Sequence, residues 1–430
     1  MEKLTGKDMA LGIQHLFAMF GATILVPLLT GLNPATALVT AGIGTLIFHL
    51  CTSFKVPVFQ GSSFAYLTAI SAVVASQGIQ YAQGGVIFAG AIYLVIAGIA
   101  FLAGADRIKR IFPSVVTGPV IIVIGLSMVS TAVGDATNTT VTGSPGASLL
   151  VAIFTLAVVI VCTIFAKGFF KLVPILIGLA AGYLLCVILS FAGVFTMDYS
   201  AIATAHWINI PYYTKDFFPL PKFSLTAILA IAPIAIVTCM EHLGDITTNG
   251  AVVGKDFFKD PGLHRALLGD GLGTIVAGFL GGPASTTYSE NTGVLATTKN
   301  YNPRLLRIAA VFAIILGIFG KFGAILQTIP TPVRGGVEFM LFGMISAVGI
   351  RTLAEANLDF THSRNLIIVA LILSIGTGFS VTGGLEIVVG AMDISISGLF
   401  LAVVIGVILN LILPDKLEEE ESEANAEGNK

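Results

Sequence analysis

The stretch Ser285 to Lys299, STTYSENTGVLATTK, lies between two long hydrophobic regions and decides the fold. Glu290 and Asn291 stand among small hydroxylated residues, and Gly282 and Pro283 just upstream interrupt the helix that would carry them across a bilayer. A carboxylate at membrane depth is costly unless it faces a cavity or a partner, and non-helical backbone is tolerated there only where it lines protein or a cavity. The stretch therefore predicts a broken span that carries a substrate site. The alternative is that Glu290 caps a loop at the membrane surface.

The whole chain has the composition of a membrane protein. Of its 430 residues, 55% are hydrophobic and 11% are charged, and the mean hydropathy is +0.94. Soluble domains carry about 25% charged residues, so this composition indicates an all-α polytopic membrane protein. The net charge of -2 offers no basic surface to a nucleic acid. The acidic run after Leu417 predicts a solvated, disordered tail over residues 415 to 430.

Hydropathy predicts 14 spans, because a helix needs about 20 apolar residues to cross the hydrocarbon core. The expected limits are 9 to 29, 35 to 54, 58 to 76, 82 to 104, 113 to 133, 148 to 166, 172 to 194, 224 to 249, 262 to 281, 284 to 298, 303 to 325, 330 to 350, 364 to 380 and 394 to 413.

The positions of Lys and Arg predict the topology of these spans. If the connections alternate between the two sides, 18 of the 22 Lys and Arg residues fall on one side. Cytoplasmic loops collect positive charge, so we expect both termini in the cytoplasm and a multi-pass protein in the plasma (inner) membrane. The long connection 195 to 222 then lies outside and contains the sole tryptophan, Trp207, which we expect at the membrane interface.

The two halves of the chain are similar when one is shifted by about 227 positions. Each half has seven expected spans, an odd number, so the second copy must cross the membrane in the opposite direction. This pattern predicts an inverted repeat, an architecture common among secondary transporters. The alternative is chance similarity between glycine-rich apolar helices. The aligned pairs are Gln14-His15-Leu16 with Glu241-His242-Leu243, Asn33-Pro34 with Asp260-Pro261, GIGTLI at 42 to 47 with GLGTIV at 271 to 276, and Ser63-Phe64 with Thr287-Tyr288.

The repeat makes two broken segments equivalent, GSSFAY at 61 to 66 in the third span and STTYSE at 285 to 290 in the tenth. Their free backbone N–H groups, and the positive ends of the helices that follow, are expected to point toward a ligand near the midplane. Such a site favours planar, carbonyl-bearing or anionic ligands.

Glu241 and Asp245 lie one turn apart on the same face of the eighth span. Two acids facing one cavity suit proton binding, since burial and mutual repulsion both favour a protonated carboxyl. The alternative is that they bond to neighbouring hydroxyls or to Lys or Arg. His242 and His15 occupy equivalent repeat positions; either is a candidate proton relay or a hydrogen-bonded packing residue.

The chain contains no motif of the usual catalytic or metal sites. There is no HExxH or GxSxG pattern, and GxG patterns fall inside hydrophobic spans, where glycines serve packing. The four cysteines have no paired spacing, so we expect neither disulfides nor zinc and no cofactor. A membrane enzyme acting on a lipid or peptide is the weaker hypothesis. The cysteines are Cys51, Cys162, Cys186 and Cys239.

The residues resemble those of a known family, the nucleobase/ascorbate transporters, or nucleobase:cation symporters of the second type. The family signature is Gln, Glu or Pro, then Asn-x-Gly, four residues, Thr, and Arg, Lys or Gly. The run from Glu290 to Lys299, ENTGVLATTK, satisfies every position. The resemblance covers nearly the whole chain, and the bacterial uracil carriers of the family are the most similar. Further matching stretches are QHLFAMFGAT at 14 to 23, NPAT at 33 to 36, GSSFAY, EHLGD, DPGLHR at 260 to 265 and TTYSEN.

The resemblance implies a fold of two inverted seven-span repeats with short antiparallel strands in spans 3 and 10. It implies a core domain from spans 1 to 4 and 8 to 11, at residues 1-111 and 223-328. A gate domain comprises spans 5 to 7 and 12 to 14, at residues 112-222 and 329-414. It also implies proton-driven uptake and a homodimer formed through the gate domains.

The resemblance further implies a substrate site, carried over by position. Glu241 and Glu290 would hold the base, the backbone at Phe64 and Ser289 would meet its carbonyls, and Phe64 and Tyr288 would pack near its ring. Phe342 falls where a gate-domain aromatic closes the site. Glu241, Glu290, Asp245 and His242 are the candidates for carrying the coupling proton.

Two departures from the family pattern bear on the substrate. Glu290 opens the signature where xanthine and urate carriers usually have Gln, which favours uracil. Asp245 stands where the most similar uracil carriers have His, and an acid there is common in purine carriers. The sequence therefore favours a proton-coupled importer of uracil, with a xanthine or other purine permease as the alternative and a small-anion transporter as a weaker one.

Overall fold

The computed structural model describes residues 5–208, 220–389 and 392–414. The predicted tail at 415 to 430 and residues 209 to 219 of the long connection lie outside the described residues. In the described part, nine helical segments are long and apolar enough to cross a membrane, and two shorter apolar ones are Phe64–Gln77 and Gly398–Ile412. These segments confirm a helical, polytopic membrane protein, while the count of 14 spans stays a prediction.

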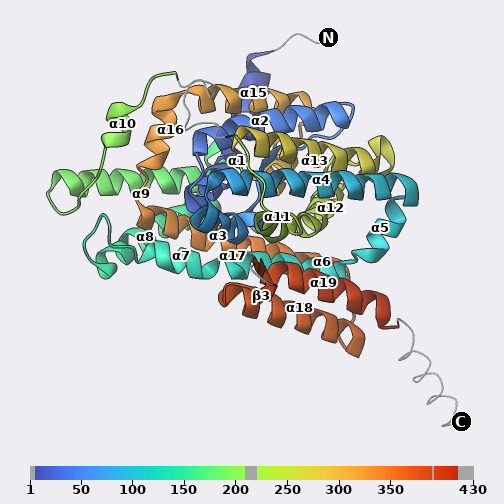
Figure 1. Cartoon of the computed structure of the whole chain (residues 1–430). Coiled ribbons are helices and arrows are strands. Elements are labelled where there is room, and N and C mark those ends of the chain that lie inside the picture. Colours follow the sequence, from blue (N-terminus) through green and yellow to red (C-terminus); the bar gives the residue numbers. More distant parts are fainter. Residues whose placement is uncertain (1–4, 209–219, 390–391, 415–430) are drawn as a thin grey trace, which may run out of the picture.

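The described elements follow one another as in Figure 1. The first half comprises α1 (Gly6–Thr30), α2 (Pro34–Cys51), β1 (Gln60–Ser62), η1 (Phe64–Tyr66), α3 (Leu67–Gln77), α4 (Ile79–Ala103), α5 (Ala105–Ile111), α6 (Ser114–Ser127), α7 (Val129–Ala136), α8 (Pro145–Phe165), η2 (Gly168–Leu172), α9 (Pro174–Phe191) and α10 (Ser200–Thr204). The second half comprises α11 (Leu225–Ile231), α12 (Ile234–Val253), η3 (Phe258–Gly262), α13 (Leu263–Leu280), β2 (Ser285–Thr287), α14 (Ser289–Thr298), α15 (Arg304–Ile318), α16 (Gly320–Gln327), α17 (Thr331–Glu355), α18 (Ser363–Val381), β3 (Leu385–Val389), β4 (Met392–Ile396) and α19 (Gly398–Ile412).

Two groups of helices pack among themselves. In one group α2 packs on α13 and α15, and α13 packs on α4; in the other, α6 packs on α17 and α18, and α18 packs on α19. Figure 1 shows α15, α2, α13 and α4 above and α17, α6, α19 and α18 below, with α3, α11 and α12 between them.

The inverted repeat is visible in how the two short strands are held. β1 and β2 pair antiparallel, with Gly61 opposite Thr286. The Thr45 hydroxyl on α2 accepts the Gln60 N–H at 2.9 Å, and the Thr274 hydroxyl on α13 accepts the Ser285 N–H at 3.3 Å. Because these two threonines come from the aligned GIGTLI and GLGTIV stretches, the same motif anchors the same strand in both halves.

Close approach of α2 and α13 depends on glycine. A Cβ at Gly273 would stand 2.4 Å from Gln60 Oε1 and 3.2 Å from the Gly44 Cα. Small residues at such crossings let helix backbones pack tightly in lipid. At its other end α2 is started by Asn33, whose side chain accepts the Ala35 N–H, and by Pro34 at the first helical position.

The chain before α19 differs from the expected span of 394 to 413. Residues Leu385–Val389 and Met392–Ile396 form an antiparallel hairpin, and the helix begins only at Gly398. The stretch MDISI alternates apolar and polar residues, and LEIVV is rich in β-branched side chains; both patterns favour strands over helix. The predicted start of the last span is therefore wrong by four residues.

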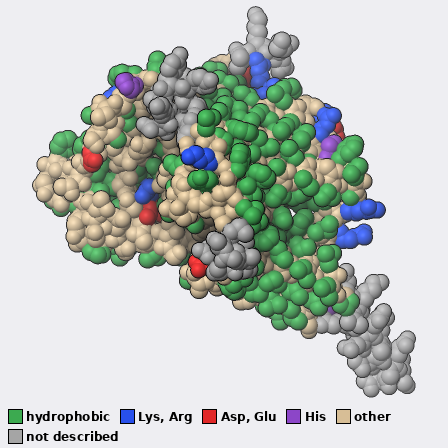
Figure 2. Space-filling model, viewed as in Figure 1, with side chains coloured by type: hydrophobic (Ala, Val, Ile, Leu, Met, Phe, Trp, Pro, Cys, Tyr) green, Lys and Arg blue, Asp and Glu red, His purple; other side chains and the backbone are tan. Residues whose placement is uncertain are grey.

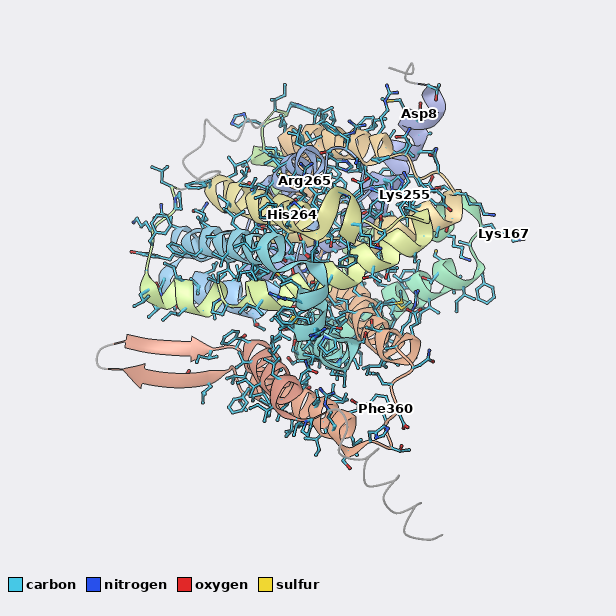
Figure 3. All side chains as sticks on the ribbon, turned by 90° about the vertical axis from the view of Figure 1, so that its right-hand side faces the viewer. Asp8, Lys167, Lys255, His264, Arg265 and Phe360 are labelled. Atoms are coloured by element: carbon cyan, nitrogen blue, oxygen red, sulfur yellow. The ribbon has the colours of Figure 1, made fainter. Side chains whose placement is uncertain are left out.

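Charged and apolar side chains occupy different parts of the surface. Figure 2 shows a broad apolar face with Lys and Arg gathered at one end, and Figure 3 looks onto that end, where Lys167, Lys255 and Arg265 are labelled. All three belong to the side that the alternation of loops assigned to the cytoplasm. On the connection predicted to be outside, Trp207 is 67% exposed and its ring meets Phe319 edge-to-face at 6.1 Å.

Candidate functional site

Two helix N-termini begin where β1 and β2 end. η1 starts at Phe64 and α14 starts at Ser289, and neither has a side-chain hydrogen bond capping its first N–H groups. The first N–H groups of a helix have no partner within the helix and form a ready acceptor-binding site. The predicted backbone donors at Phe64 and Ser289 therefore stand at equivalent places in the two halves.

Three acids of the predicted site interact with one another. Glu241 and Asp245 lie one turn apart on α12, and Glu290 lies in the first turn of α14. Asp245 and Glu290 both act electrostatically on Glu241. Glu241 is half-buried, and its Oε2 atom has no hydrogen-bond partner in the described structure, whereas Glu290 is exposed. Oε2 of Glu241 thus remains free to accept a hydrogen bond from a ligand.

Asp245 has a different role from the glutamates. Its Oδ2 atom accepts the Thr287 hydroxyl at 2.8 Å, and its Oδ1 atom accepts the Ser289 hydroxyl. The aspartate is 8% exposed. The alternative proposed from the sequence, that this acid bonds to neighbouring hydroxyls, is the one observed. Asp245 therefore fixes the junction of β2 and α14 to α12.

Tyr288 is fixed by the opposite strand. Its hydroxyl donates to the Ser62 carbonyl at 2.8 Å and accepts the Thr23 hydroxyl at 3.3 Å. Pro27 has no N–H to give the Thr23 carbonyl, and the Ser62 hydroxyl donates to that carbonyl at 3.2 Å instead. With 5% of its surface exposed, Tyr288 forms a wall of the site at the strand crossing.

Phe64 links the strand crossing to α17. Its ring meets that of Phe342 on α17 edge-to-face, with centroids 5.6 Å apart. Phe342 is fully buried and Phe64 is 7% exposed. The predicted gate aromatic is thus in contact with the predicted ligand-stacking ring.

The two predicted histidines lie beside polar groups other than the three acids. His242 is fully buried, and its Nδ1 atom lies 2.7 Å from Oδ2 of Asp270 on α13. The Gln60 amide donates to the other oxygen of Asp270. At the equivalent place, the Asn291 amide donates to the His15 carbonyl at 2.9 Å. Asn291 thus ties α14 to α1 at His15, and Asp270 lies between His242 on α12 and Gln60 on β1.

The sequence profile of the Permease family matches residues 6–387 of this chain. The chain belongs to this family, the nucleobase/ascorbate transporters. The probable uracil permease of Pasteurella multocida (strain Pm70) is 42% identical over 414 residues, which cover 96% of this chain and 95% of that protein. The uracil permease of Bacillus caldolyticus is 44% identical over 422 residues, covering 97% and 94%.

A solved structure of another transporter shares the fold of this nucleobase/ascorbate transporter. The murine solute carrier 26 family member A9, an anion transporter solved in the inward-facing state, superposes with a TM-score of 0.67 at 10% identity. The match covers 96% of this chain and 69% of that one. The likeness at this identity concerns the fold alone.

Sequence reasoning missed two buried acids of this transporter. Asp270 and Glu338 are both fully buried, on α13 and α17. Each lies inside an expected span, and an acid inside a span is a functional candidate by default, so the signal was present. Thr287 was recognised only as a repeat position, because its bond to Asp245 joins residues 42 positions apart.

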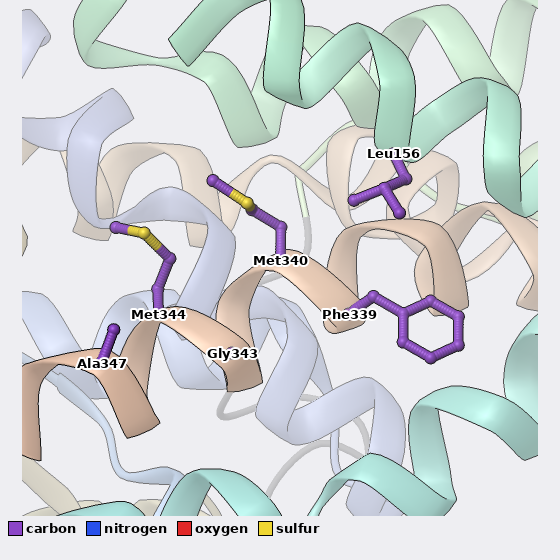
Figure 4. Close-up of a pocket in the computed structure, with 6 residues that line it drawn as sticks. All are labelled: Leu156, Phe339, Met340, Gly343, Met344 and Ala347. Atoms are coloured by element: carbon purple, nitrogen blue, oxygen red, sulfur yellow. The ribbon is translucent and has the colours of Figure 1, made fainter. Parts of the chain in front are cut away.

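A groove on α17 is a poor candidate for the substrate site. It encloses about 270 Å³ between α8 and α17 and is lined by Leu156, Phe339, Met340, Gly343, Met344 and Ala347 (Figure 4). These side chains offer no hydrogen-bonding group to a planar base. Among the described residues, no group of three or more His, Cys, Asp or Glu side chains is arranged to hold a metal ion.

Proposed function

We propose that this protein is a secondary transporter that imports uracil together with protons by alternating access. The observation that carries the proposal is the meeting of Glu241 and Glu290 with two uncapped helix N-termini at the β1–β2 crossing. Relatives named uracil permeases, at 42% and 44% identity over nearly the full chain, support the same substrate.

The chemistry of uracil matches these groups. Uracil presents two N–H donors that alternate with two carbonyl acceptors around a planar ring. Glu241 and Glu290 accept from the ring nitrogens, and the backbone N–H groups at Phe64 and Ser289 donate to the carbonyls. A site built this way rejects analogues without those edges, because its own polar groups would be left unpaired. The side chains of Phe64 and Tyr288 pack near the uracil ring.

Proton coupling follows from the charge of the site. Glu241, Asp245 and Glu290 act on one another, and the mutual repulsion of ionised carboxylates favours a proton on one of them. We assign the coupling proton to Glu241 or Glu290, because Asp245 is engaged by two hydroxyls and His242 by Asp270.

Alternating access requires two bodies that move past each other. We assign residues 1-111 and 223-328 to a core domain and residues 112-222 and 329-414 to a gate domain, with Phe64 and Phe342 in contact across the boundary. We place both termini in the cytoplasm and the protein in the plasma membrane. The apolar groove on α17 suits a partner in the bilayer, and a homodimer through the gate domains is our proposal for the assembly.

A purine such as xanthine is the second candidate, because Asp245 is an acid. Its two hydrogen bonds argue against a purine substrate. Both carboxylate oxygens of Asp245 accept from protein hydroxyls, those of Thr287 and Ser289, and not from a ligand. The only support for an anion substrate is the fold that this protein shares with the murine anion transporter. We assign the protein no enzymatic activity, in line with relatives that are named permeases.

Uptake of radiolabelled uracil into proteoliposomes, with and without an inward proton gradient, tests this proposal. We expect gradient-dependent accumulation that excess unlabelled xanthine, sulfate or bicarbonate does not reduce. Uptake abolished by xanthine would transfer the assignment to a purine. Folded protein that takes up no uracil under either condition would refute the proposed function.

A further inference from the structure

Asp135, Arg334 and Glu338 form a charged cluster apart from the acids of the substrate site. Arg334 and Glu338 lie one turn apart on α17, and Asp135 lies near the end of α7. Arg334 Nη2 is 3.4 Å from Asp135 Oδ2, with side chains that are 15% and 18% exposed. Glu338 is fully buried. The cluster is thus enclosed between two helices that contribute no acid to the substrate site.

Glu338 has no donor for its carboxyl oxygens. In the described part of the chain no N–H or O–H group donates to either oxygen. The carboxyl of Glu338 instead lies within hydrogen-bonding reach of the carboxyl of Asp135. Two carboxyl groups can form a hydrogen bond only when one of them carries a proton, and a buried carboxylate without a donor is costly. The pair therefore requires a proton.

The surroundings supply one positive charge against the two acids. Arg334 is that charge, and α6, α8 and α9, which also pack on α17, carry no acidic or basic residue. Their titratable side chains are Cys162, Tyr183 and Cys186, and the Tyr183 hydroxyl is bonded to Thr328. One bound proton makes the cluster neutral, as a buried group of charges requires.

Arg334 also reaches across to α1. Its Nη1 atom donates to the Leu28 carbonyl at 3.2 Å. Leu28 is in the last turn of α1, where carbonyls have no partner within the helix. The contact therefore ties the cluster on α7 and α17 to α1, which packs on α15 and α2.

We propose that Asp135 and Glu338 together bind one proton and that Arg334 connects this second proton-binding site to α1. A movement of α17 away from α1 removes the Leu28 carbonyl from Arg334. The guanidinium then keeps the Thr331 hydroxyl, which accepts from Nη2 at 3.3 Å, and the two carboxyl groups as its partners. The loss of the Leu28 carbonyl favours the ionised form of the carboxyl groups and release of the proton. The link to transport rests on the proposed function, whereas proton binding itself does not.

Infrared absorption of protonated carboxyl groups tests the site in the purified full-length protein. We expect the wild-type spectrum to contain a protonated-carboxyl band that is absent from Glu338→Gln and that disappears as the pH is raised. Glu355→Gln is the matched control, because Glu355 lies on the same helix with a side chain that is 62% exposed and paired with Arg351. That control should keep the band. Identical spectra for wild type and Glu338→Gln at every pH would overturn the proposal.

Asp135→Asn gives a second test that does not require Glu338→Gln to fold. The introduced amide donates to Glu338 and stabilises its ionised form, so the band should disappear about one pH unit lower or more. An unchanged midpoint would contradict a shared proton. Neither spectrum needs uracil, so a wild-type protein that shows the titrating band but takes up no uracil would refute the proposed function and retain this site.

Discussion

Thr287 at the end of β2 donates a 2.8 Å hydrogen bond to Oδ2 of Asp245 on α12. Two residues further along the chain, the Ser289 hydroxyl donates to Oδ1 of the same aspartate. One carboxylate thereby sets the direction in which the chain leaves the strand and enters α14. The position of Glu290, one residue further on, depends on this arrangement.

The first prediction concerns Asp245→Asn. The amide of asparagine accepts at one atom only, so one of the two hydroxyls loses its acceptor. A hydrogen bond to a charged group contributes about 1.5–3 kcal/mol, and polar bonds between membrane helices average about 0.6 kcal/mol. We expect Asp245→Asn to retain uracil uptake. A loss of about 1.5 kcal/mol corresponds to a KM for uracil that is about tenfold higher.

The matched control for Asp245→Asn is Thr247→Val. Thr247 is exposed on the same helix, and its hydroxyl bonds only to the Leu243 carbonyl at 2.7 Å. Its KM should equal that of the wild type. An unchanged KM in Asp245→Asn would mean that the two hydroxyls do not position the site.

The second prediction concerns Glu241→Gln and Glu290→Gln. An amide presents its NH2 group where a carboxylate accepts the N–H of the base, and the loss of one such bond costs about 1.5–3 kcal/mol. We expect kcat/KM for uracil to fall by about ten- to a hundredfold in each variant, and the response to the proton gradient to disappear in the one that carries the proton. Wild-type uptake rates in both variants, at equal membrane levels, would refute the site assignment. Glu355→Gln serves as the control here as well.

The third prediction concerns Gly61→Ala at the strand crossing. A Cβ at Gly61 would lie 2.4 Å from Cε2 of Tyr288, whose hydroxyl is held by Ser62. Overpacking of this kind costs about 1–3 kcal/mol, so we expect a lower Tm in thermal unfolding of the purified protein. Gly98→Ala is the control, because nothing lies within 4 Å of the added Cβ on α4. An equal Tm for both variants would show that the ring of Tyr288 can move aside.

The broken spans and their acids were predictable because they depend on local chemistry. The signature from Glu290, the aligned GIGTLI and GLGTIV stretches and the glycine and proline interruptions each act over a few residues. The two threonines of those stretches do hold the two strands. Charge placement was equally local, and Lys167, Lys255 and Arg265 lie on one face as expected.

The partners of the buried polar groups were not predictable, because they depend on distances between segments far apart in the chain. Sequence spacing placed Asp245 beside Glu241, but only the fold brings Thr287 to its carboxylate. In the same way the sequence named His242 as a candidate for the coupling proton but gave no sign of Asp270, which lies 2.7 Å from its Nδ1 atom. The hairpin of β3 and β4 was hidden for another reason, since apolar residues of a strand and of a helix contribute alike to hydropathy.

The last prediction concerns Asp270, one of the two buried acids that the sequence did not single out. Its two carboxylate oxygens serve the Gln60 amide and His242 Nδ1, and all three side chains are fully buried. In Asp270→Asn either the Gln60 amide or His242 Nδ1 must face the NH2 group of the new amide. Leaving a buried polar group without its partner costs about 1–3 kcal/mol, which should lower the Tm of the purified protein.

Asp256→Asn is the control for this effect, because Asp256 has a side chain that is 50% exposed, and an asparagine there can still accept the Phe258 N–H. Its Tm should stay at the wild-type value. Uracil binding separates a structural role of Asp270 from a direct one. Since His242 and Gln60 hold β1 to α12 and α13, binding at temperatures well below the Tm should weaken less than in Glu241→Gln. A Tm equal to that of the wild type, with binding abolished, would instead assign Asp270 to the substrate site.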